Sequence, residues 1–159
     1  MLKSSKIKPF LWFEDQAEEA ATFYTSVFRN SKMGRISRFP AGSPRPAGMA
    51  MTAEFELEGQ PFVALNGGPE YAFTPAVSFS VACEDQNEID DYWEKLTSGG
   101  GKPVQCGWLV DRYGLSWQIV PKRMNELFSG KDPKRAERVM QAMLNMVKLD
   151  IGKLEEAAR

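Results

Sequence analysis

The chain has 159 residues, of which 43% are hydrophobic and 26% are charged, so it is long enough to bury an ordinary globular core. Its 20 basic and 21 acidic residues leave a net charge of −1, which provides no field for nucleic acid or an anionic membrane. Histidine is absent, which excludes serine–histidine and cysteine–histidine nucleophile pairs and imidazole metal ligands.

The beginning of the chain and its cysteines indicate the cellular compartment. The first residues are basic, but the apolar stretch before Glu14 is only five residues long, too short for the core of a signal peptide. No apolar run approaches the roughly 20 residues that a membrane-spanning helix needs. Cys83 and Cys106 lack the spacing of a metal-binding pair and are expected to be free thiols. We therefore expect a soluble cytoplasmic protein that binds neither membranes nor nucleic acid.

The first half of the chain, about residues 6–69, predicts a strand, a helix and three further strands. Lys8–Phe13 is a short apolar strand, and Asp15–Glu18 has the sequence of a capping box for the helix that follows. Alternating apolar and polar residues later in this half predict a strand with one buried face. The three strands after the helix are expected at Gly34–Phe39, Met49–Leu57 and Pro61–Asn66.

The second half, about residues 75–121, repeats this pattern. The apolar helix positions Ala20 and Phe23 recur 69 residues later at Ile89 and Tyr92. A strand at Ala76–Cys83 and a capping box at Asp85–Glu88 precede that helix. Three strands follow it, at Lys102–Gln105, Gly107–Val110 and Leu115–Val120. Both halves read β-α-β-β-β, and we expect a single domain, residues 1–159, built from two such modules.

A helical tail, about residues 123–159, follows the second module. Asp132 is a predicted N-cap with Pro133 at the first helical position, and Asp150 is expected to cap a further turn. Apolar residues recur at helical spacing between them, at Ala136, Val139, Met140, Met143, Leu144 and Val147. This face is expected to pack on the sheet or on a partner subunit rather than to form a pliable binding surface.

Four segments carry a resemblance to a known family, namely Phe10–Phe13, Ala17–Tyr24, Leu65–Pro69 and Cys106–Pro121. Together they resemble the PhnB-like branch of the vicinal oxygen chelate superfamily, which includes glyoxalases, ring-cleaving dioxygenases and bleomycin-binding proteins. Members of this branch are often labelled 3-demethylubiquinone 3-methyltransferase. The resemblance implies an α+β fold in which two βαβββ modules form a curved eight-stranded mixed sheet. It also implies helices on the convex face, an added C-terminal helix, a concave ligand cleft and a homodimer.

The same resemblance locates the positions that hold a divalent metal in superfamily enzymes. In this sequence they fall at Pro9, Phe62 or Ala64, Ser78 and Gln118. Proline and phenylalanine cannot bind a metal, serine rarely does, and a lone glutamine is a weak neutral ligand. We therefore expect a cleft without a metal or another cofactor.

Strand alternation predicts which side chains face this cleft. The bulkier Phe10 and Trp12 are expected on the helix side of the first strand, which turns Leu11 and Phe13 toward the cleft. Both cysteines are expected to be inert packing residues. Of the two, Cys106 is the better candidate for a reactive thiol, because Lys102 or Arg112 could lower its pKa. The expected cleft residues are Leu11, Phe13, Asn66, Ser78, Ser80, Cys106, Trp108, Ser116 and Gln118.

Neutral polar groups in an aromatic cavity suit a small, largely apolar ligand. For Asn66 and Gln118, hydrogen bonding within the protein alone is an equally weighted alternative, and for the serines it is the favoured one. We expect a ligand-binding protein and identify no catalytic residue. Two enzymatic alternatives stay open, a metal-independent or methyltransferase-type enzyme and a metal-dependent glyoxalase-type enzyme. Metal-independent catalysis is disfavoured because no histidine and no carboxylate is expected deep in the cleft. Methyl transfer is disfavoured because Asn66–Pro69, although rich in glycine, does not lead into a helix.

Overall fold

The structure, a computed structural model, describes residue 2 and residues 4–159. The chain divides into two compact units, Met1–Ala72 and Phe73–Arg159, called unit 1 and unit 2 below. Each unit contains one four-stranded mixed sheet, so the eight expected strands are present as two sheets of four. The α+β class is confirmed. No helix within residues 4–159 has the length and apolar content to cross a bilayer.

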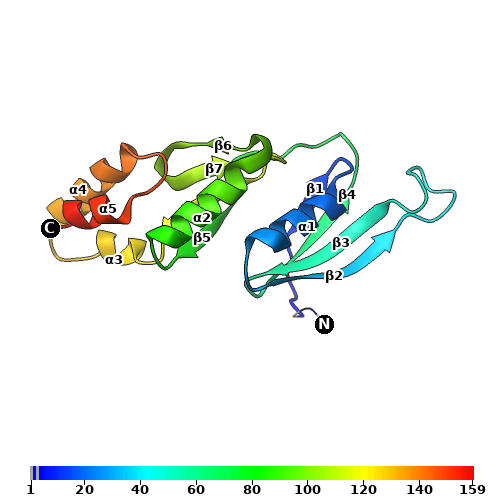
Figure 1. Ribbon diagram of the computed structural model, residues 1–159, viewed down its shortest axis with the longest axis horizontal. Coiled ribbons are helices and arrows are strands. Elements are labelled where there is room, and N and C mark those ends of the chain that lie inside the picture. The colour runs from blue at the N-terminus through cyan, green and yellow to red at the C-terminus, as the bar shows by residue number, and fades with distance from the viewer. Residues whose placement is uncertain (1, 3) are drawn as a thin grey trace. The chain divides into compact units, whose positions relative to one another are not determined.

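Unit 1 has the expected β-α-β-β-β order. Its elements are β1 (Phe10–Phe13), α1 (Ala17–Val27), β2 (Ser31–Arg38), β3 (Ala50–Leu57) and β4 (Gln60–Asn66). The strand order in the sheet is β1-β4-β3-β2, with β1 parallel to β4 and the other neighbours antiparallel. Helix α1 lies along one face of this sheet (Figure 1).

The core of unit 1 lies between α1 and that face. Tyr24 of α1 stacks on Phe55 of β3 with ring centroids 6.1 Å apart, and Phe55 stacks on Phe62 of β4 at 5.3 Å. Ala53, Phe55 and Leu57 are buried as the expected alternation predicts, but Glu56 between them is buried too, at 7% exposed.

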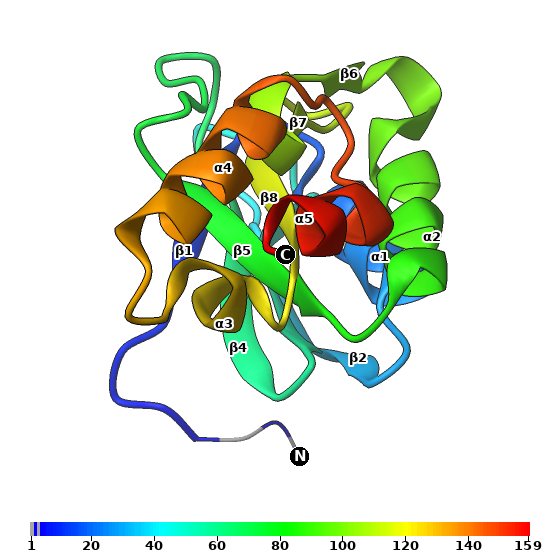
Figure 2. The ribbon, with the colours of Figure 1, turned by 90° about the vertical axis from the view of Figure 1, so that its left-hand side faces the viewer.

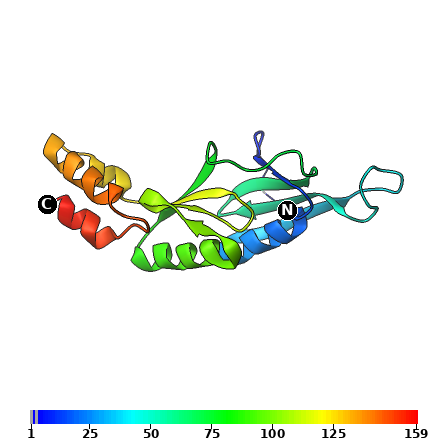
Figure 3. The ribbon, with the colours of Figure 1, turned by 90° about the horizontal axis from the view of Figure 1, so that it is seen from above.

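Unit 2 repeats the order and adds two short 3₁₀ turns. Its module consists of β5 (Ser78–Cys83), α2 (Gln86–Thr97), η1 (Ser98–Gly100), β6 (Lys102–Pro103), η2 (Gln105–Gly107), β7 (Trp108–Val110) and β8 (Ser116–Pro121). The strand order β5-β8-β7-β6 matches that of unit 1, with β5 parallel to β8. Helix α2 lies along one face of this sheet (Figure 3).

Asp85 caps α2 as the sequence predicts. Its carboxylate accepts a hydrogen bond from the backbone N of Glu88 at 2.9 Å. The Glu88 carboxylate reaches back to the backbone N of Glu84 at 2.6 Å. Two backbone donors at the start of the helix are therefore satisfied by side chains.

The tail forms three helices where one main helix was expected, α3 (Met124–Phe128), α4 (Pro133–Leu144) and α5 (Ile151–Ala157). Figure 2 shows them grouped together in unit 2. The predicted caps are confirmed, since Asp132 accepts from Lys134 N and Asp150 from Lys153 N, both at 3.0 Å. The helices bury a small core of their own, made of Leu127, Val139, Leu149 and Leu154.

The backbone at the start of β7 anchors this tail. Cys106 N donates to the carbonyl of Met146 at 2.9 Å, and Gly107 N donates to that of Val147 at 2.8 Å. Both donors belong to residues with positive φ, 59° and 82°. The left-handed turn of Cys106, unusual for a residue other than glycine, aims two adjacent N–H groups at the chain between α4 and α5.

Candidate functional site

The strand register of unit 2 brings five of the predicted cleft residues onto one sheet face. Ser78 pairs with Ser116, and Gln118 of β8 lies between Ser80 of β5 and Trp108 of β7. Paired residues on neighbouring strands share a face. These five residues, Ser78, Ser80, Trp108, Ser116 and Gln118, are called the polar face of unit 2 below.

The opposite face of the same sheet forms the core under α2. Leu109, Trp117 and Ile119 alternate with the polar residues and are almost completely buried. The rings of Phe79 and Trp117 lie 5.7 Å apart on this side. The parity predicted for β5 and β8 therefore describes the sheet correctly.

Hydrogen bonding on the polar face is incomplete. Gln118 Nε2 donates to Ser78 Oγ at 3.0 Å, which partly satisfies the carboxamide in mid-strand. Ser116 is only 1% exposed, and its Oγ has no hydrogen-bond partner among the described residues. A buried hydroxyl without a partner is unfavourable by about 1–3 kcal/mol. The face therefore retains hydrogen-bonding capacity that a bound molecule or a water could use.

Cys106 is not part of the polar face of unit 2 and lies in η2, just before β7. Its thiol is free and half-buried. Cys83, the second free cysteine, is buried at the end of β5 and lines a hollow of about 330 Å³ together with Gln86, Arg123 and Leu127. Burial, and to a lesser extent the charges of Glu88 and Asp85, raises the pKa of the Cys83 thiol to about 12. Cys83 is therefore a protonated, unreactive thiol at neutral pH.

The predicted orientation of β1 is wrong. Leu11 pairs with Ala64 and Phe13 with Asn66, so both lie on the face that α1 covers, where they are 5% and 3% exposed. The prediction assigned the bulkier side chains to the helix. However, α1 buries the small side chains of Ala17, Ala20 and Ala21 beside Tyr24 and Val27, so the helix side of β1 does not require the bulkier residues.

Asn66 also lies on the helix-covered face, and both ends of its carboxamide are occupied. Its Oδ1 accepts from Ala17 N at 2.8 Å, and its Nδ2 donates to the carbonyl of Ala50 at 2.9 Å. The Gln16 cap residue makes no side-chain bond to the helix, so the capping box predicted at Asp15–Glu18 does not form. Asn66 performs that role from β4, and the expectation that it faces a cleft is wrong.

The glycines after Asn66 serve the packing of Trp12. A Cβ atom on Gly67 would lie 2.3 Å from the indole ring of Trp12. The indole nitrogen donates to the carbonyl of Gly68 at 2.9 Å, and the ring meets Tyr71 edge-on at 5.1 Å. This loop binds a side chain of its own unit, and nothing in its geometry favours a methyl-donor site.

Asp111 is a residue that the sequence interpretation missed. Asp111 lies in the turn between β7 and β8, where charged side chains are usually solvated, yet it is only 3% exposed. Its Oδ1 accepts from Tyr113 N at 2.8 Å and Leu115 N at 3.1 Å, and its Oδ2 accepts from the indole of Trp117 at 2.9 Å. The carboxylate organises the β7–β8 hairpin that carries Trp108 and Gln118. This role becomes visible only in the folded structure, where the buried indole of Trp117 donates to the carboxylate.

The residues at the superfamily's metal positions do not fit a divalent cation. Phe62 stacks in the core of unit 1, and Ser78 and Gln118 are bonded to each other. Pro9 has no side-chain donor atom. Among the described residues, no group of three or more Cys, Asp or Glu side chains is placed to hold a metal.

The model of the 3-demethylubiquinone-9 3-methyltransferase family matches residues 5–120. The chain belongs to this family. A PhnB protein from Bacillus cereus, described as a putative member of the same family, is 39% identical and superposes with a TM-score of 0.68 over 74% of this chain and 99% of that one. The resemblance to the PhnB-like branch of the vicinal oxygen chelate superfamily is therefore confirmed. No curated protein matches the chain.

More distant structures agree on the fold alone. Protein PA1353 from Pseudomonas aeruginosa is 21% identical, with a TM-score of 0.62 over 75% of this chain and 98% of that one. The fosfomycin resistance protein FosX from Mesorhizobium loti is 11% identical, with a TM-score of 0.55 over 79% of this chain and 97% of that one. The family match ends at residue 120, so α3, α4 and α5 of this chain lie beyond it.

Proposed function

We propose that this protein binds a small, largely apolar molecule on the polar face of unit 2 and that the binding requires no metal. The observation that supports the proposal is the buried, unpartnered hydroxyl of Ser116 beside the Gln118–Ser78 hydrogen bond. Small-ligand sites combine an apolar wall with a few fixed polar groups. Trp108 offers the aromatic surface, and Ser78, Ser116 and Gln118 offer the polar groups.

The side chains of the polar face favour ligand binding without a catalysed reaction. All five residues of the polar face are neutral, and none is a general acid or base near neutral pH. Asp111, the nearby buried carboxylate, is already engaged by three donors. The family's methyltransferase description suggests a second activity, but the loop at Gly67 and Gly68 is occupied by Trp12, and no other observation favours methyl transfer.

We further infer a cytoplasmic homodimer. The two free cysteines are consistent with a reducing compartment. Met140 and Leu144 of α4, 40% and 51% exposed, are apolar side chains that a second copy could cover. Native mass spectrometry of the untagged protein reports both the mass of the assembly and any molecule that co-purifies with it.

The ligand proposal is tested with N-phenyl-1-naphthylamine, a neutral apolar fluorophore with one N–H group. Ser116→Ala or Gln118→Ala, whichever removes the acceptor of that N–H group, is expected to weaken its affinity about tenfold, the effect of losing one good buried hydrogen bond. Ser129→Ala, which removes an exposed hydroxyl of unit 2 that donates to the Glu126 carbonyl, is the matched control and should bind like the wild type. Equal affinities for all four proteins would refute binding at this face.

A further inference from the structure

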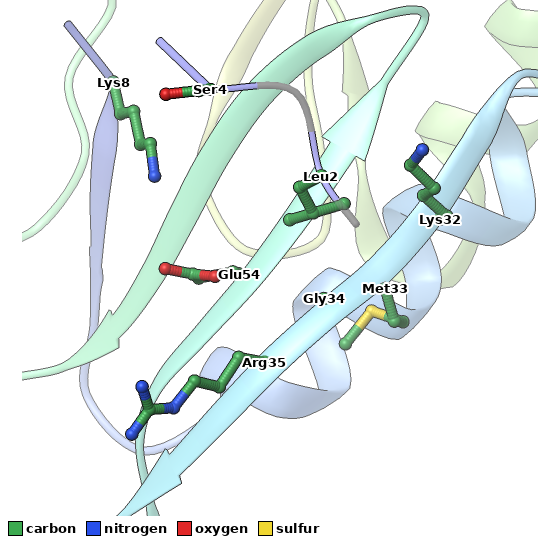
Figure 4. Close-up of a pocket in the computed structure, with 8 residues that line it drawn as sticks. All are labelled: Leu2, Ser4, Lys8, Lys32, Met33, Gly34, Arg35 and Glu54. Carbon is green, nitrogen blue, oxygen red and sulfur yellow. The ribbon is translucent and has the colours of Figure 1, made fainter. Parts of the chain in front are cut away.

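Unit 1 contains a hollow of about 600 Å³ on the sheet face opposite α1. Its wall comes from the chain before β1, from β2 and from β3, and Figure 4 shows eight residues that line it. The volume lies within the range of small-molecule sites. None of these residues was singled out by the sequence, and all belong to unit 1.

A β-bulge shapes this hollow. Met33 pairs with Phe55 and Ile36 with Ala53, so two residues of β2, Gly34 and Arg35, stand opposite the single residue Glu54 of β3. A bulge bends its strand and redirects side chains. Figure 4 shows the Arg35 guanidinium and the Glu54 carboxylate on the same side of the sheet.

Gly34 creates room that the N-terminal segment uses. A Cβ atom at Gly34 would lie 2.3 Å from Cδ1 of Leu2. Leu2 therefore lies directly on the β2 backbone and, together with Met33, contributes an apolar wall to the hollow. Leu2 can lie against this part of the sheet because position 34 carries no side chain.

The charges around the hollow are predominantly positive. Lys8, Lys32 and Arg35 line it, and Glu54 is the one acidic residue among the described residues that do. Lys32 has a counter-ion in Glu56 at 3.9 Å. Lys8 and Arg35 make no ion pair with any described residue, and Figure 4 shows the Glu54 side chain lying between them. Two cations thus share one carboxylate that lies beyond ion-pair distance of either.

We propose that this hollow is a second binding site and that it takes a small organic anion. The acidic group of the ligand meets Lys8 and Arg35, and its apolar part lies against Leu2 and Met33. Arginine and lysine are the usual partners of carboxylate and phosphate groups, and charge-assisted hydrogen bonds are the stronger ones. This site differs in charge and in unit from the neutral ligand site on β5, β7 and β8.

The test uses 8-anilinonaphthalene-1-sulfonate, an aromatic organic anion, with neutral N-phenyl-1-naphthylamine as its uncharged analogue. The double variant Lys8→Gln/Arg35→Gln is expected to bind the sulfonate about tenfold more weakly than the wild type. Its affinity for the neutral analogue should not change. Lys153→Gln/Arg159→Gln, which removes the same charge from exposed positions of unit 2, is the matched control and should change the sulfonate affinity less than about twofold.

Glu54→Gln gives a test of opposite sign. Removal of the carboxylate between Lys8 and Arg35 should tighten sulfonate binding, and added NaCl should weaken it by screening. Ser116→Ala, which tests the site in unit 2, should leave the affinity for the sulfonate unchanged. Sulfonate binding that is unaffected by Lys8→Gln/Arg35→Gln, or that Glu54→Gln weakens, would overturn the proposal. Neither result would bear on the proposed ligand site of unit 2, because binding at that site is measured with the neutral probe.

Discussion

Asn66 caps helix α1 from a neighbouring strand, since its side-chain oxygen lies 2.8 Å from the backbone nitrogen of Ala17. The same carboxamide donates to Ala50 of β3. One side chain at the end of β4 therefore joins the helix to the sheet. Because Asn66 is 2% exposed, water cannot replace either bond when the side chain is removed.

Asn66→Ala is expected to lower the free energy of unfolding by about 2–3 kcal/mol, because a helix N-terminal donor and a buried carbonyl lose their partners. Urea denaturation followed by circular dichroism measures this. Asn30→Ala, which truncates an exposed asparagine of the same unit, is the control and should cost less than about 0.5 kcal/mol. A loss of similar size in both variants would contradict the role of Asn66.

Asp111→Asn should destabilise unit 2 by about 2–3 kcal/mol. The carboxylate accepts three hydrogen bonds on its two oxygens. An amide would therefore point an N–H group at another N–H group in either orientation. Asp91→Asn removes an exposed carboxylate that pairs with Lys95 and should cost less than about 0.5 kcal/mol. Equal unfolding midpoints for the wild type and Asp111→Asn would show that the buried carboxylate is not required.

Cys83 should make stability fall at alkaline pH. The pKa of its thiol is raised to about 12 in the folded protein, chiefly by burial. The unfolded chain gives up this proton at lower pH. The contribution of the protonated thiol to the free energy of unfolding is therefore fully present below about pH 9 and is lost as pH rises toward 12. The free energy of unfolding of Cys83→Ala should depend less on pH across this interval than that of the wild type. Parallel pH profiles for the two proteins would contradict the raised pKa.

The same burial predicts selective alkylation. Iodoacetamide at neutral pH is expected to label Cys106, which is half-buried, well before Cys83, which is buried. Mass spectrometry of the labelled peptides measures the order. Labelling of Cys83 first in the folded protein would contradict the assignment of an inert thiol.

Gln118→Glu should not create a tight metal site. It adds one carboxylate beside Ser78, while Phe62 stays packed against Phe55 and Pro9 offers no side-chain donor. One strong ligand is too few for a divalent cation. Calorimetric titration with Mn²⁺ and Zn²⁺ should detect no micromolar binding in the wild type or the variant. Micromolar affinity in the variant would show that the four positions do form a site.

Much of the local structure could be predicted from the sequence because its signals are local. The caps at Asp85, Asp132 and Asp150 depend on bonds that span two or three residues. Alternation within β8 separates Trp117 from Gln118 whatever the strand packs against. Alternation within β5 separates Ser78 and Ser80 from Phe79 in the same way.

Predictions failed where the deciding partner is distant in the chain. The cap of α1 comes from Asn66, 49 positions beyond Ala17. The direction of Leu11 depends on whether the helix above it presents large or small side chains. Asp111 is buried because the indole of Trp117 reaches it. Each outcome depends on a contact that neither period nor propensity encodes.

The sequence by itself determined the repeated β-α-β-β-β order, the family resemblance and the absence of metal-ligand chemistry at the four superfamily positions. These properties depend on residue type and spacing along the chain. Only the tertiary structure decided which face of β1 is buried, which polar groups are already paired, and that Gly34 and Arg35 form a bulge over a basic hollow. Those properties arise when distant strands align in register, because burial and hydrogen-bond partners exist only after the chain has folded.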